Sequence, residues 1–463
     1  MKIRVENLGA LRQAEFSLGD LTIICGENNT GKTYATCALY GFLRYWREHL
    51  PVRVSDETIR TLLSDGAVHI DVAEYQKDVV SLLEKGSANY TEQLPAIFAA
   101  SKDRFKESEF LVEVDPGDID VSRKYERIIA GAGNTDIFSL GKARDGTELI
   151  VTLLVEKEAL KPPRDTILWV IGNVLRDILF EPLFPDPFIA SAERTGAAIF
   201  RKELDFARNR LIEEIGQGEK NIDPMKLFYK TYKDYALPVK ENVDFTRQLE
   251  ETARESSFIA EDHEEILSDF SDIIGGKYTV TRNDELYFLP KGRRGVKLSM
   301  DESSSAVRSL LDIGFYLKHI AKPGDILMVD EPELNLHPRN QRRVARLFAR
   351  LVNIGIKVFV TTHSDYLIKE LNTLIMLHPG GPRLEGIAER EGYLPQELLS
   401  PEQINVYIAE EKLLPQPGKT KRKRGLTLTP ANIDPDLGIE VRSFDTTIVE
   451  MNQIQDEILW GEE

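Results

Sequence analysis

Apolar and polar residues alternate along the first 25 residues of the chain. The alternation predicts three short strands, at residues 3–5, 16–18 and 21–25, separated by glycine-containing turns. From Lys32 onward, apolar residues recur at helical spacing as far as Trp46. A strand, a glycine-rich loop and a helix therefore follow one another directly.

A second patterned region lies in the later part of the chain. Residues 326–329 and 358–360 are apolar and predict two buried strands, and residues 341–351 predict an amphipathic helix between them. This order indicates parallel strands joined by a right-handed crossover. Residues 278–281 and 286–289 flank an Asn-Asp turn and predict a β-hairpin.

The pattern between these two regions is less regular. Helix-like stretches surround candidate strands at 109–114 and 149–155, and the prolines within 182–187 mark a boundary. Residues 188–191 predict a strand that returns to the main sheet, and residues 201–270 suggest a protruding helical arm. We therefore expect an α/β fold with a mixed sheet, a small antiparallel β subdomain and a largely helical insertion.

The composition limits the classes of protein to which the chain can belong. The chain has 463 residues, of which 42% are hydrophobic and 29% charged, as in globular proteins. Its two cysteines, Cys25 and Cys37, are too few for a disulfide framework or a four-thiolate zinc site. No apolar run approaches 18 residues and no secretion signal opens the chain, so we expect a cytoplasmic protein without membrane association.

The charge balance limits contact with nucleic acid. The net charge is −17, so the average surface repels polyanions, and any nucleic-acid contact requires a local basic patch. One run near the end of the chain could supply it, either as a solvated loop or as a segment that contacts phosphates or a partner. Its residues are Lys419, Lys421, Arg422, Lys423 and Arg424.

Residues 26–33 carry the strongest motif. They read Gly-Glu-Asn-Asn-Thr-Gly-Lys-Thr, which fits the phosphate-loop pattern G-x-x-x-x-G-K-[ST] between a strand and a helix. The glycines let successive amides point at phosphate oxygens. We expect Lys32 to bridge the outer phosphates and the Thr33 hydroxyl to ligate Mg²⁺. The predicted nucleotide-binding residues are Gly26, Asn28, Asn29, Thr30, Gly31, Lys32 and Thr33.

Acidic residues and a histidine follow the two buried strands. Asp330 and Glu331 come directly after residues 326–329, at the carboxyl end of a strand, where α/β sheets bind ligands. Asp330 is the expected Mg²⁺ ligand, and Glu331 is placed to orient or deprotonate the attacking water. His363 follows the next strand and could reach the γ-phosphate or that water. Lys32, Glu331 and His363 are thus the predicted catalytic residues, while His337 is equally consistent with a turn-forming role.

These motifs, separated by a long insertion, resemble the ABC-type ATPase head of the RecF, SMC and OLD group. The opening Ile-x-Val-x-Asn-Leu-Gly is similar to those heads as well. The resemblance implies a P-loop NTPase that binds ATP and Mg²⁺. It also implies heads that close as a dimer or higher homo-oligomer, with ATP between one copy's phosphate loop and the other's serine motif.

Single heads without a long coiled coil look most like ATPase subunits of bacterial anti-phage systems such as the Septu ATPase. That resemblance implies an ATPase that controls a separately encoded effector, a nuclease or toxin. Two alternatives remain: a DNA-maintenance ATPase of RecF or SMC type that clamps DNA, with nucleic acid as a partner, and a nucleotide-gated scaffold with little turnover.

The serine motif departs from the family pattern, which is close to Leu-Ser-Gly-Gly-Glu. The candidate residues are Ser303, Ser304 and Ser305, ahead of a helix expected to begin near Leu310. Ser305 stands where the family has glycine, and Ala306 where it has an acidic residue. Helix amides and hydroxyls can still bind a γ-phosphate, but losing glycine restricts the approach of the backbone. We therefore expect slow hydrolysis more than weak binding.

Two further segments complete the sequence-based expectations. Arg194 could contact nucleotide or a neighbouring subunit, or it could form a structural ion pair with Glu193 or another acidic residue. Asp434 and Asp436 have the spacing of a fused nuclease but lack a buried strand before them, so none is expected. The expected boundaries are 1–50 for the first part of the head, 51–185 for an insertion, 186–200 for a return to the head, 201–275 for the arm, 276–395 for the rest of the head, and 396–463 for a partner-binding or tail region.

Overall fold

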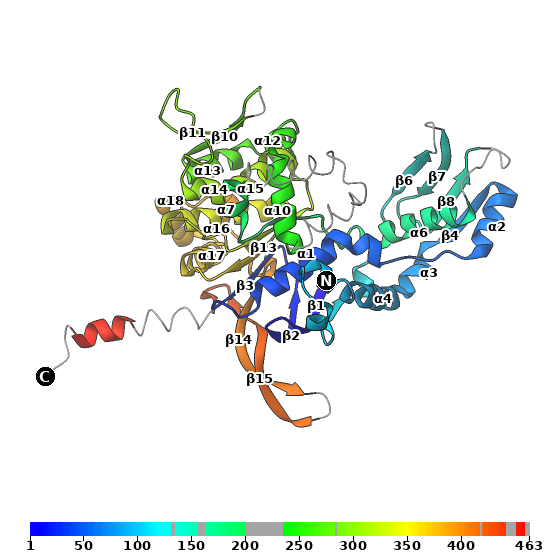
Figure 1. Ribbon diagram of the computed structural model, residues 1–463, viewed down its shortest axis with the longest axis horizontal. Coiled ribbons are helices and arrows are strands. Elements are labelled where there is room, and N and C mark those ends of the chain that lie inside the picture. The colour runs from blue at the N-terminus through cyan, green and yellow to red at the C-terminus, as the bar shows by residue number, and fades with distance from the viewer. Residues whose placement is uncertain are drawn as a thin grey trace, which may run out of the picture. The chain divides into compact units, whose positions relative to one another are not determined.

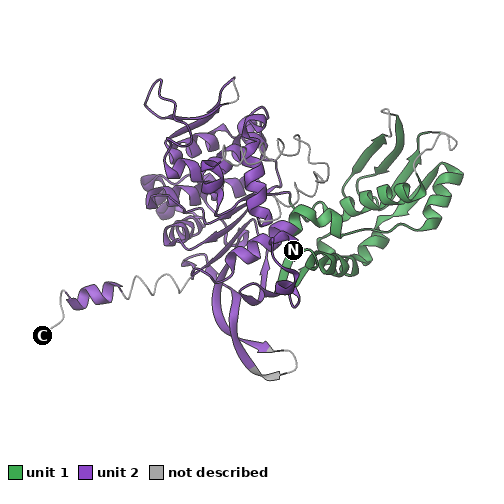
Figure 2. Cartoon of the chain, viewed as in Figure 1, with its two compact units in different colours: residues 1–4, 42–93, 109–185 green, residues 5–41, 94–108, 186–463 purple. Residues whose placement is uncertain are grey.

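The computed structural model describes residues 1–130, 135–155, 163–200, 235–282, 285–416, 419–440 and 451–458. The chain divides into two compact units, coloured separately in Figure 2. The first comprises residues 1–4, 42–93 and 109–185, and the second comprises residues 5–41, 94–108 and 186–463. The first unit thus holds most of the predicted insertion. Much of the predicted helical arm lies outside the described residues.

A nine-stranded sheet provides the framework of the site (Figure 1). Its order is β5-β1-β2-β15-β14-β3-β13-β12-β9. The strands β3, β13, β12 and β9 run parallel, and β14 pairs parallel with β3 but antiparallel with β15. The expected mixed α/β fold is confirmed. The strands are β1 (Lys2–Leu8), β2 (Leu11–Ser17), β3 (Leu21–Gly26), β5 (Glu109–Glu113), β9 (Pro187–Ala190), β12 (Ile326–Asp330), β13 (Lys357–Thr362), β14 (Ile404–Gln416) and β15 (Lys419–Pro430).

The central strands are buried along their length because they are apolar on both faces, as parallel strands covered by helices are. Between β12 and β13 the chain forms α16 (Pro338–Asn353), whose apolar side includes Val344, Leu347 and Leu351. α16 packs against β13 and against α17 (Asp365–Leu377). The predicted strand–helix–strand unit is therefore confirmed. So is the returning strand β9, which pairs parallel with β12.

The predicted β-hairpin is confirmed, because β10 (Gly276–Val280) pairs antiparallel with β11 (Leu286–Pro290).

The helix that follows the serines begins earlier than predicted. Helix α14 (Ser305–Ser309) starts at Ser305, not near Leu310, because the Ser304 side chain accepts a hydrogen bond from the Val307 amide and caps the helix. It is followed by α15 (Leu311–Phe315) and the π-helical turn η4 (Tyr316–Ile320).

The sheet extends beyond the predicted end of the head near residue 395. β14 lies next to β3, with Ala409 opposite Gly26, so residues 404–409 belong to the same sheet as the phosphate loop. The basic run lies on β15 and not in a loop. The remaining elements of this unit are α5 (Leu94–Ile97), η1 (Lys102–Phe105), α7 (Arg194–Ile199), α10 (Leu237–Arg247), α11 (Leu249–Thr252), α12 (Phe258–Asp262), α13 (Glu264–Ile274), α18 (Pro382–Glu391), η5 (Pro395–Glu397), η6 (Pro401–Gln403), β16 (Ile433–Asp434) and β17 (Gly438–Ile439).

The first unit combines helices with an antiparallel sheet of order β4-β8-β7-β6. Aromatic side chains make up much of its core, including Phe42, Trp46, Tyr90, Phe110 and Phe184. Its elements are α2 (Asp56–Asp65), β4 (Ala67–Asp71), α3 (Val72–Lys77), α4 (Val79–Thr91), η2 (Pro116–Asp118), β6 (Tyr125–Ala130), β7 (Asp136–Lys142), β8 (Glu148–Leu153) and α6 (Arg164–Phe180). Helix α1 (Lys32–His49) begins in the second unit and ends in the first. Over the described ranges, no helix is long and apolar enough to cross a membrane.

Candidate functional site

The loop between β3 and α1 has the backbone that a phosphate loop requires. Gly26 and Gly31 have φ of +142° and +93°, and Asn29 has φ of +63°, a value that asparagine tolerates. A Cβ on Gly26 would lie 2.6 Å from the carbonyl oxygen of Ala409, and one on Gly31 would lie 2.7 Å from Cγ of Leu11. Both glycines are therefore required by conformation and by space.

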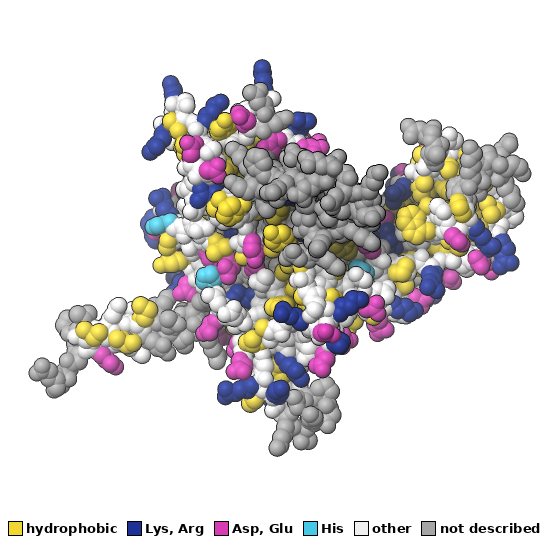
Figure 3. Space-filling model, in the orientation of Figure 1, with side chains coloured by type: hydrophobic (Ala, Val, Ile, Leu, Met, Phe, Trp, Pro, Cys, Tyr) yellow, Lys and Arg dark blue, Asp and Glu magenta, His cyan; other side chains and the backbone are white. Residues whose placement is uncertain are grey.

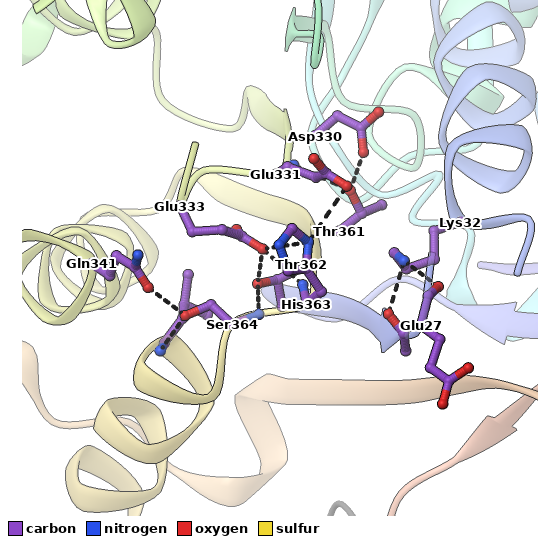
Figure 4. A network of polar contacts seen from close by, with 12 residues as sticks. Glu27, Lys32, Asp330, Glu331, Glu333, Gln341, Thr361, Thr362, His363 and Ser364 are labelled. Carbon is purple, nitrogen blue, oxygen red and sulfur yellow. Dashed lines mark hydrogen bonds and ion pairs between the residues drawn. The ribbon is translucent and has the colours of Figure 1, made fainter. Parts of the chain in front are cut away.

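Lys32 lies inside this loop. Its side chain is buried, and Nζ donates hydrogen bonds to the carbonyl oxygens of Gly26, at 2.9 Å, and Glu27, at 2.7 Å. Thr30 also bonds the Glu27 carbonyl, at 2.8 Å, whereas the neighbouring Asn28 is exposed. Burial lowers the pKa of Lys32, and the nearby acidic side chains oppose that shift. The loop thus encloses a cation that faces the acidic strand ends (Figure 4).

The two predicted metal ligands lie side by side. The Thr33 hydroxyl donates to Oδ2 of Asp330 at 3.2 Å, and the Thr361 hydroxyl donates to Oδ1. Burial raises the pKa of Asp330, while both hydroxyl contacts pull it down. A hydroxyl and a carboxylate are hard oxygen ligands of the kind that Mg²⁺ takes together with phosphates and water. Within the described ranges, no group of three or more His, Cys, Asp or Glu side chains is placed to hold a metal ion.

Glu331 and His363 also come together. Nδ1 of His363 lies 3.5 Å from Oε1 of Glu331 and 3.2 Å from Oε1 of Glu333. Glu331 has φ of +51°, an uncommon conformation for a residue other than glycine, and its amide donates to the Thr361 carbonyl at 3.0 Å. Its side chain is 24% exposed, so a ligand at the strand ends can reach the carboxylate.

Glu333 is a site residue that the sequence analysis missed. It is buried, and its Oε1 accepts hydrogen bonds from the Thr362 hydroxyl, at 2.8 Å, and from the His363 amide, at 2.7 Å. Its Oε2 is buried and has no hydrogen-bond partner among the described residues. The available signal was a third acidic residue in Asp330-Glu331-Pro332-Glu333. Glu333 fixes the turn that presents His363 (Figure 4).

The structure corrects the predictions for Arg194 and settles that for His337. Arg194 is 1% exposed and bonds main-chain carbonyls within its own chain, so the predicted contacts with nucleotide or a neighbouring subunit are wrong. The structural alternative fits better, but its partners are these carbonyls and, electrostatically, Asp312 in place of Glu193. His337 accepts a hydrogen bond from the Arg339 amide at 3.2 Å and caps α16. Its role is therefore the turn-forming one.

The serine segment uses its hydroxyls locally. Ser304 caps α14, Ser303 donates to the Ser299 carbonyl at 2.7 Å, and Ser305 accepts from Nη2 of Arg308 at 3.4 Å. All three contacts stay within residues 299–308. The structure therefore does not join these serines to the phosphate loop of the same chain by side-chain hydrogen bonds.

A cavity of about 640 Å³ adjoins the phosphate loop on its β14 side. Gly26, Glu27 and Thr30 line it together with residues of β14 and β15, including Glu410 and Lys412. Beyond this cavity β14 and β15 continue as a projecting ribbon (Figure 1), over which Lys and Arg side chains gather (Figure 3). The sequence analysis did not anticipate this wall because β14 is almost 380 residues from β3, its partner in the sheet (404 − 26 = 378).

The chain is similar to parts of larger known proteins. UvrABC system protein A of Thermus thermophilus is 28% identical over 191 residues, or 41% of this chain and 19% of that protein. The protein of the same name from Xylella fastidiosa is 24% identical over 236 residues, 50% of this chain and 23% of that protein. The chain thus spans about a fifth of the length of these relatives.

Two solved structures overlap the chain almost completely but superpose poorly. The SMC head domain from Thermotoga maritima covers 93% of this chain, and 98% of its own length is covered, at 12% identity and a TM-score of 0.28. An Smc head domain from Pyrococcus furiosus, bound to the C-terminal domain of ScpA, covers 98% of each chain at 13% identity and a TM-score of 0.30. Such low scores do not establish a common fold.

A protein-family model extends over more of the chain. This model, described as an AAA ATPase domain, matches residues 1–130 and 194–368, which include the phosphate loop, Asp330, Glu331 and His363. The match covers more than half of the sequence. The chain therefore belongs to the AAA ATPase domain family.

Proposed function

We propose that this chain binds ATP with Mg²⁺ and hydrolyses it slowly between two copies, and that its nucleotide state controls a separate effector protein in bacterial anti-phage defence. The observation that carries the hydrolysis is the meeting of two pairs at the carboxyl ends of neighbouring strands. Oγ1 of Thr33 lies 3.2 Å from Oδ2 of Asp330, and Nδ1 of His363 lies 3.5 Å from Oε1 of Glu331.

The loop side would hold the triphosphate. The amides of residues 26–33 and Nζ of Lys32 are the donors for phosphate oxygens, and a bound triphosphate would replace the loop carbonyls as the partners of Lys32. Thr33 and Asp330 would hold Mg²⁺. When bound, that ion neutralises charge on the phosphates and orients them for displacement.

Glu331 is the group that would take a proton from the attacking water. The water oxygen bonds to the γ-phosphorus while the bond from phosphorus to the β–γ bridging oxygen breaks, and the released proton passes to the carboxylate. His363, held by Glu333, contacts the same carboxylate and fixes its direction.

The second copy would supply Ser303, Ser304 and Ser305. This part of the proposal follows from the resemblance to RecF and SMC heads. Slow turnover follows from the sequence, because Ser305 restricts the approach of the backbone and Ala306 leaves the helix start without a carboxylate. Homo-oligomerisation is thus part of the proposed active site.

The separate effector in this proposal follows from the resemblance to ATPase subunits of anti-phage systems. Oδ1 of Asp434 accepts hydrogen bonds from the amides of Asp436, at 2.8 Å, and Leu437, at 3.0 Å, and thus closes a turn. The Asp434 side chain therefore has a local structural role in this region.

The test combines turnover with defence. Purified wild-type protein, Lys32→Ala and Glu331→Gln are assayed for phosphate release from ATP, and cells carrying each variant with the neighbouring genes are challenged with phage. We expect wild-type turnover and protection, and loss of both in the two variants. Turnover without any effect of the neighbouring genes on phage growth would support hydrolysis and refute the defence role.

A second candidate, a DNA-clamping ATPase, is favoured by the basic ribbon. Arg422, Lys423 and Arg424 are exposed on β15, and Leu413 beside Arg424 is 57% exposed. A two-stranded ribbon with such charges is compatible with a DNA groove. A gel shift with duplex DNA and ATP at moderate salt tests this candidate, and an absence of binding removes it.

A further inference from the structure

Arg194 is a buried cation that connects two parts of the site. It is the first residue of α7 and is 1% exposed. Its Nε donates to the carbonyl oxygen of Ser309 at 2.7 Å, Nη1 donates to those of Ser191 at 2.8 Å and Asp330 at 2.6 Å, and Nη2 donates to that of Glu331 at 2.8 Å. One guanidinium therefore bonds four main-chain carbonyls from three separate segments.

Two of these segments belong to opposite sides of the proposed reaction. Asp330 and Glu331 stand at the end of β12, where metal and water would be held. Ser309 ends α14, the short helix that begins at Ser305 and packs against α7. Because α14 has only five residues, a displacement of its first turn moves Ser309 as well.

The bonds to Glu331 fall on a strained part of the backbone. Its φ of +51° is costly for a side chain with a Cβ and persists only where neighbours hold it. The Thr361 carbonyl holds its amide, and Arg194 holds its carbonyl. The direction of the Glu331 side chain thus depends on groups that bond its main chain from both sides.

The Arg194 guanidinium interacts electrostatically with a buried acidic side chain, Asp312. Asp312, on α15, is also 1% exposed, and its Oδ1 accepts a hydrogen bond from Thr246 at 3.4 Å. Its Oδ2 has no hydrogen-bond partner among the described residues. Burying a guanidinium costs free energy, and its hydrogen bonds and a nearby acidic group offset that cost. A contact with a purely structural role would not require a buried charge.

We propose that Arg194 is a positioning residue that ties the direction of Glu331 to the position of α14. The inference rests on the proposed function, in which Ser303, Ser304 and Ser305 meet the triphosphate of a second copy. When α14 shifts on that contact, the guanidinium carries the shift to the main chain of Asp330 and Glu331. Hydrolysis is thereby coupled to closure of the two heads.

The test is Arg194→Lys, because lysine keeps the charge but has one nitrogen and cannot bond four carbonyls. We expect affinity for a fluorescent ATP analogue within twofold of wild type and kcat lower by roughly 10- to 100-fold, the loss that small misplacements of catalytic groups cause. The matched control is Arg176→Lys. Arg176 is another buried arginine, which bonds the Arg47 carbonyl and Asp177 in the first unit. It should lower stability without changing kcat.

Hydrogen exchange with and without Mg-ATP gives a readout that does not depend on turnover. In wild type, nucleotide should change exchange both in residues 305–315 and in residues 330–336. In Arg194→Lys, the change at 305–315, which arises from direct contact with the second copy's nucleotide, should persist, and the change at 330–336 should be smaller than in wild type. The proposal is overturned if both changes survive at full size in the variant, if its kcat equals that of wild type, or if the control loses kcat equally. Wild type that binds nucleotide but shows no turnover refutes the proposed hydrolysis, and exchange then decides the coupling by itself.

Discussion

The phosphate loop and the serine segment both precede a helix, yet they use their polar groups differently. In the loop, neighbouring atoms exclude a Cβ at Gly26 and Gly31, and Lys32 is the side chain that bonds inward. In the serine segment, the hydroxyls of Ser303 and Ser304 bond groups of the segment itself. The backbone of the loop is thus held in shape by its surroundings, and Lys32 is the side chain that would exchange internal bonds for ligand bonds there. In the serine segment, the hydroxyls that would meet the ligand are themselves held by bonds within the segment.

This difference predicts that changes in the phosphate loop, or in the acidic residues after β12 that face it, remove hydrolysis or ATP binding. Changes in the serine segment should only alter the rate of hydrolysis. The largest effect is expected for Glu331→Gln. Loss of a general base lowers turnover by about 10²–10⁴-fold, while ATP binding is kept because the amide retains the shape of the carboxylate. Phosphate release and nucleotide affinity are the measurements, with the exposed Glu391→Gln on α18 as the control. A variant with normal turnover would rule out Glu331 as the base.

The next largest effect is expected for Lys32→Ala, which should weaken ATP binding. Hydrogen bonds to a charged group contribute about 1.5–3 kcal/mol, which corresponds to roughly 10- to 100-fold in affinity. Titration with a fluorescent nucleotide measures the loss, and Lys357→Ala, whose partner Asp20 stands at the other end of the sheet, is the control. Unchanged affinity would contradict the assignment of the loop.

A smaller effect, in the opposite direction, is expected on the serine side. The double variant Ser305→Gly, Ala306→Glu restores the residues that the family pattern has. Turnover should rise about two- to fivefold, since a carboxylate near a helix N-terminus contributes about 0.3–1 kcal/mol. Steady-state assays compare it with Ser305→Ala, which lacks both gains. A decrease in turnover would mean that the serine segment does not act through its backbone.

The smallest effect is expected for Asp312, the buried acidic residue of α15. Burial raises the pKa of Asp312 from 3.8 to about 7 in the folded protein. Between those values the folded state binds a proton that the unfolded state has lost, so this group stabilises the fold less as the pH rises toward 7. Thermal unfolding at pH 5 to 8.5 should show wild type losing stability relative to Asp312→Asn with rising pH. Parallel curves would show that the carboxyl does not titrate as stated.

Much of the site could be predicted because its parts are local in sequence. The phosphate loop is one run of eight residues, and Asp330, Glu331 and His363 each follow an apolar strand, so parallel strands bring them to one edge of the sheet. Glu333 could have been found in the same way, as a further acid in the turn after β12.

Other parts of the fold could not be predicted, for physical reasons. Arg422, Lys423 and Arg424 do not alternate with apolar residues, because the side chains along this part of β15 are exposed. The role of Arg194 depends on carbonyl groups, which every residue has and no sequence pattern marks. The helix start at Ser305 depends on a cap by Ser304, one of three consecutive serines.

The most direct test of the account is to locate the metal in crystals grown with ATP and Mn²⁺ in place of Mg²⁺. Anomalous diffraction should place one manganese ion between the Thr33 hydroxyl and the Asp330 carboxylate, beside a triphosphate that contacts Lys32. Manganese at another position, or a nucleotide bound away from residues 26–33, would contradict it.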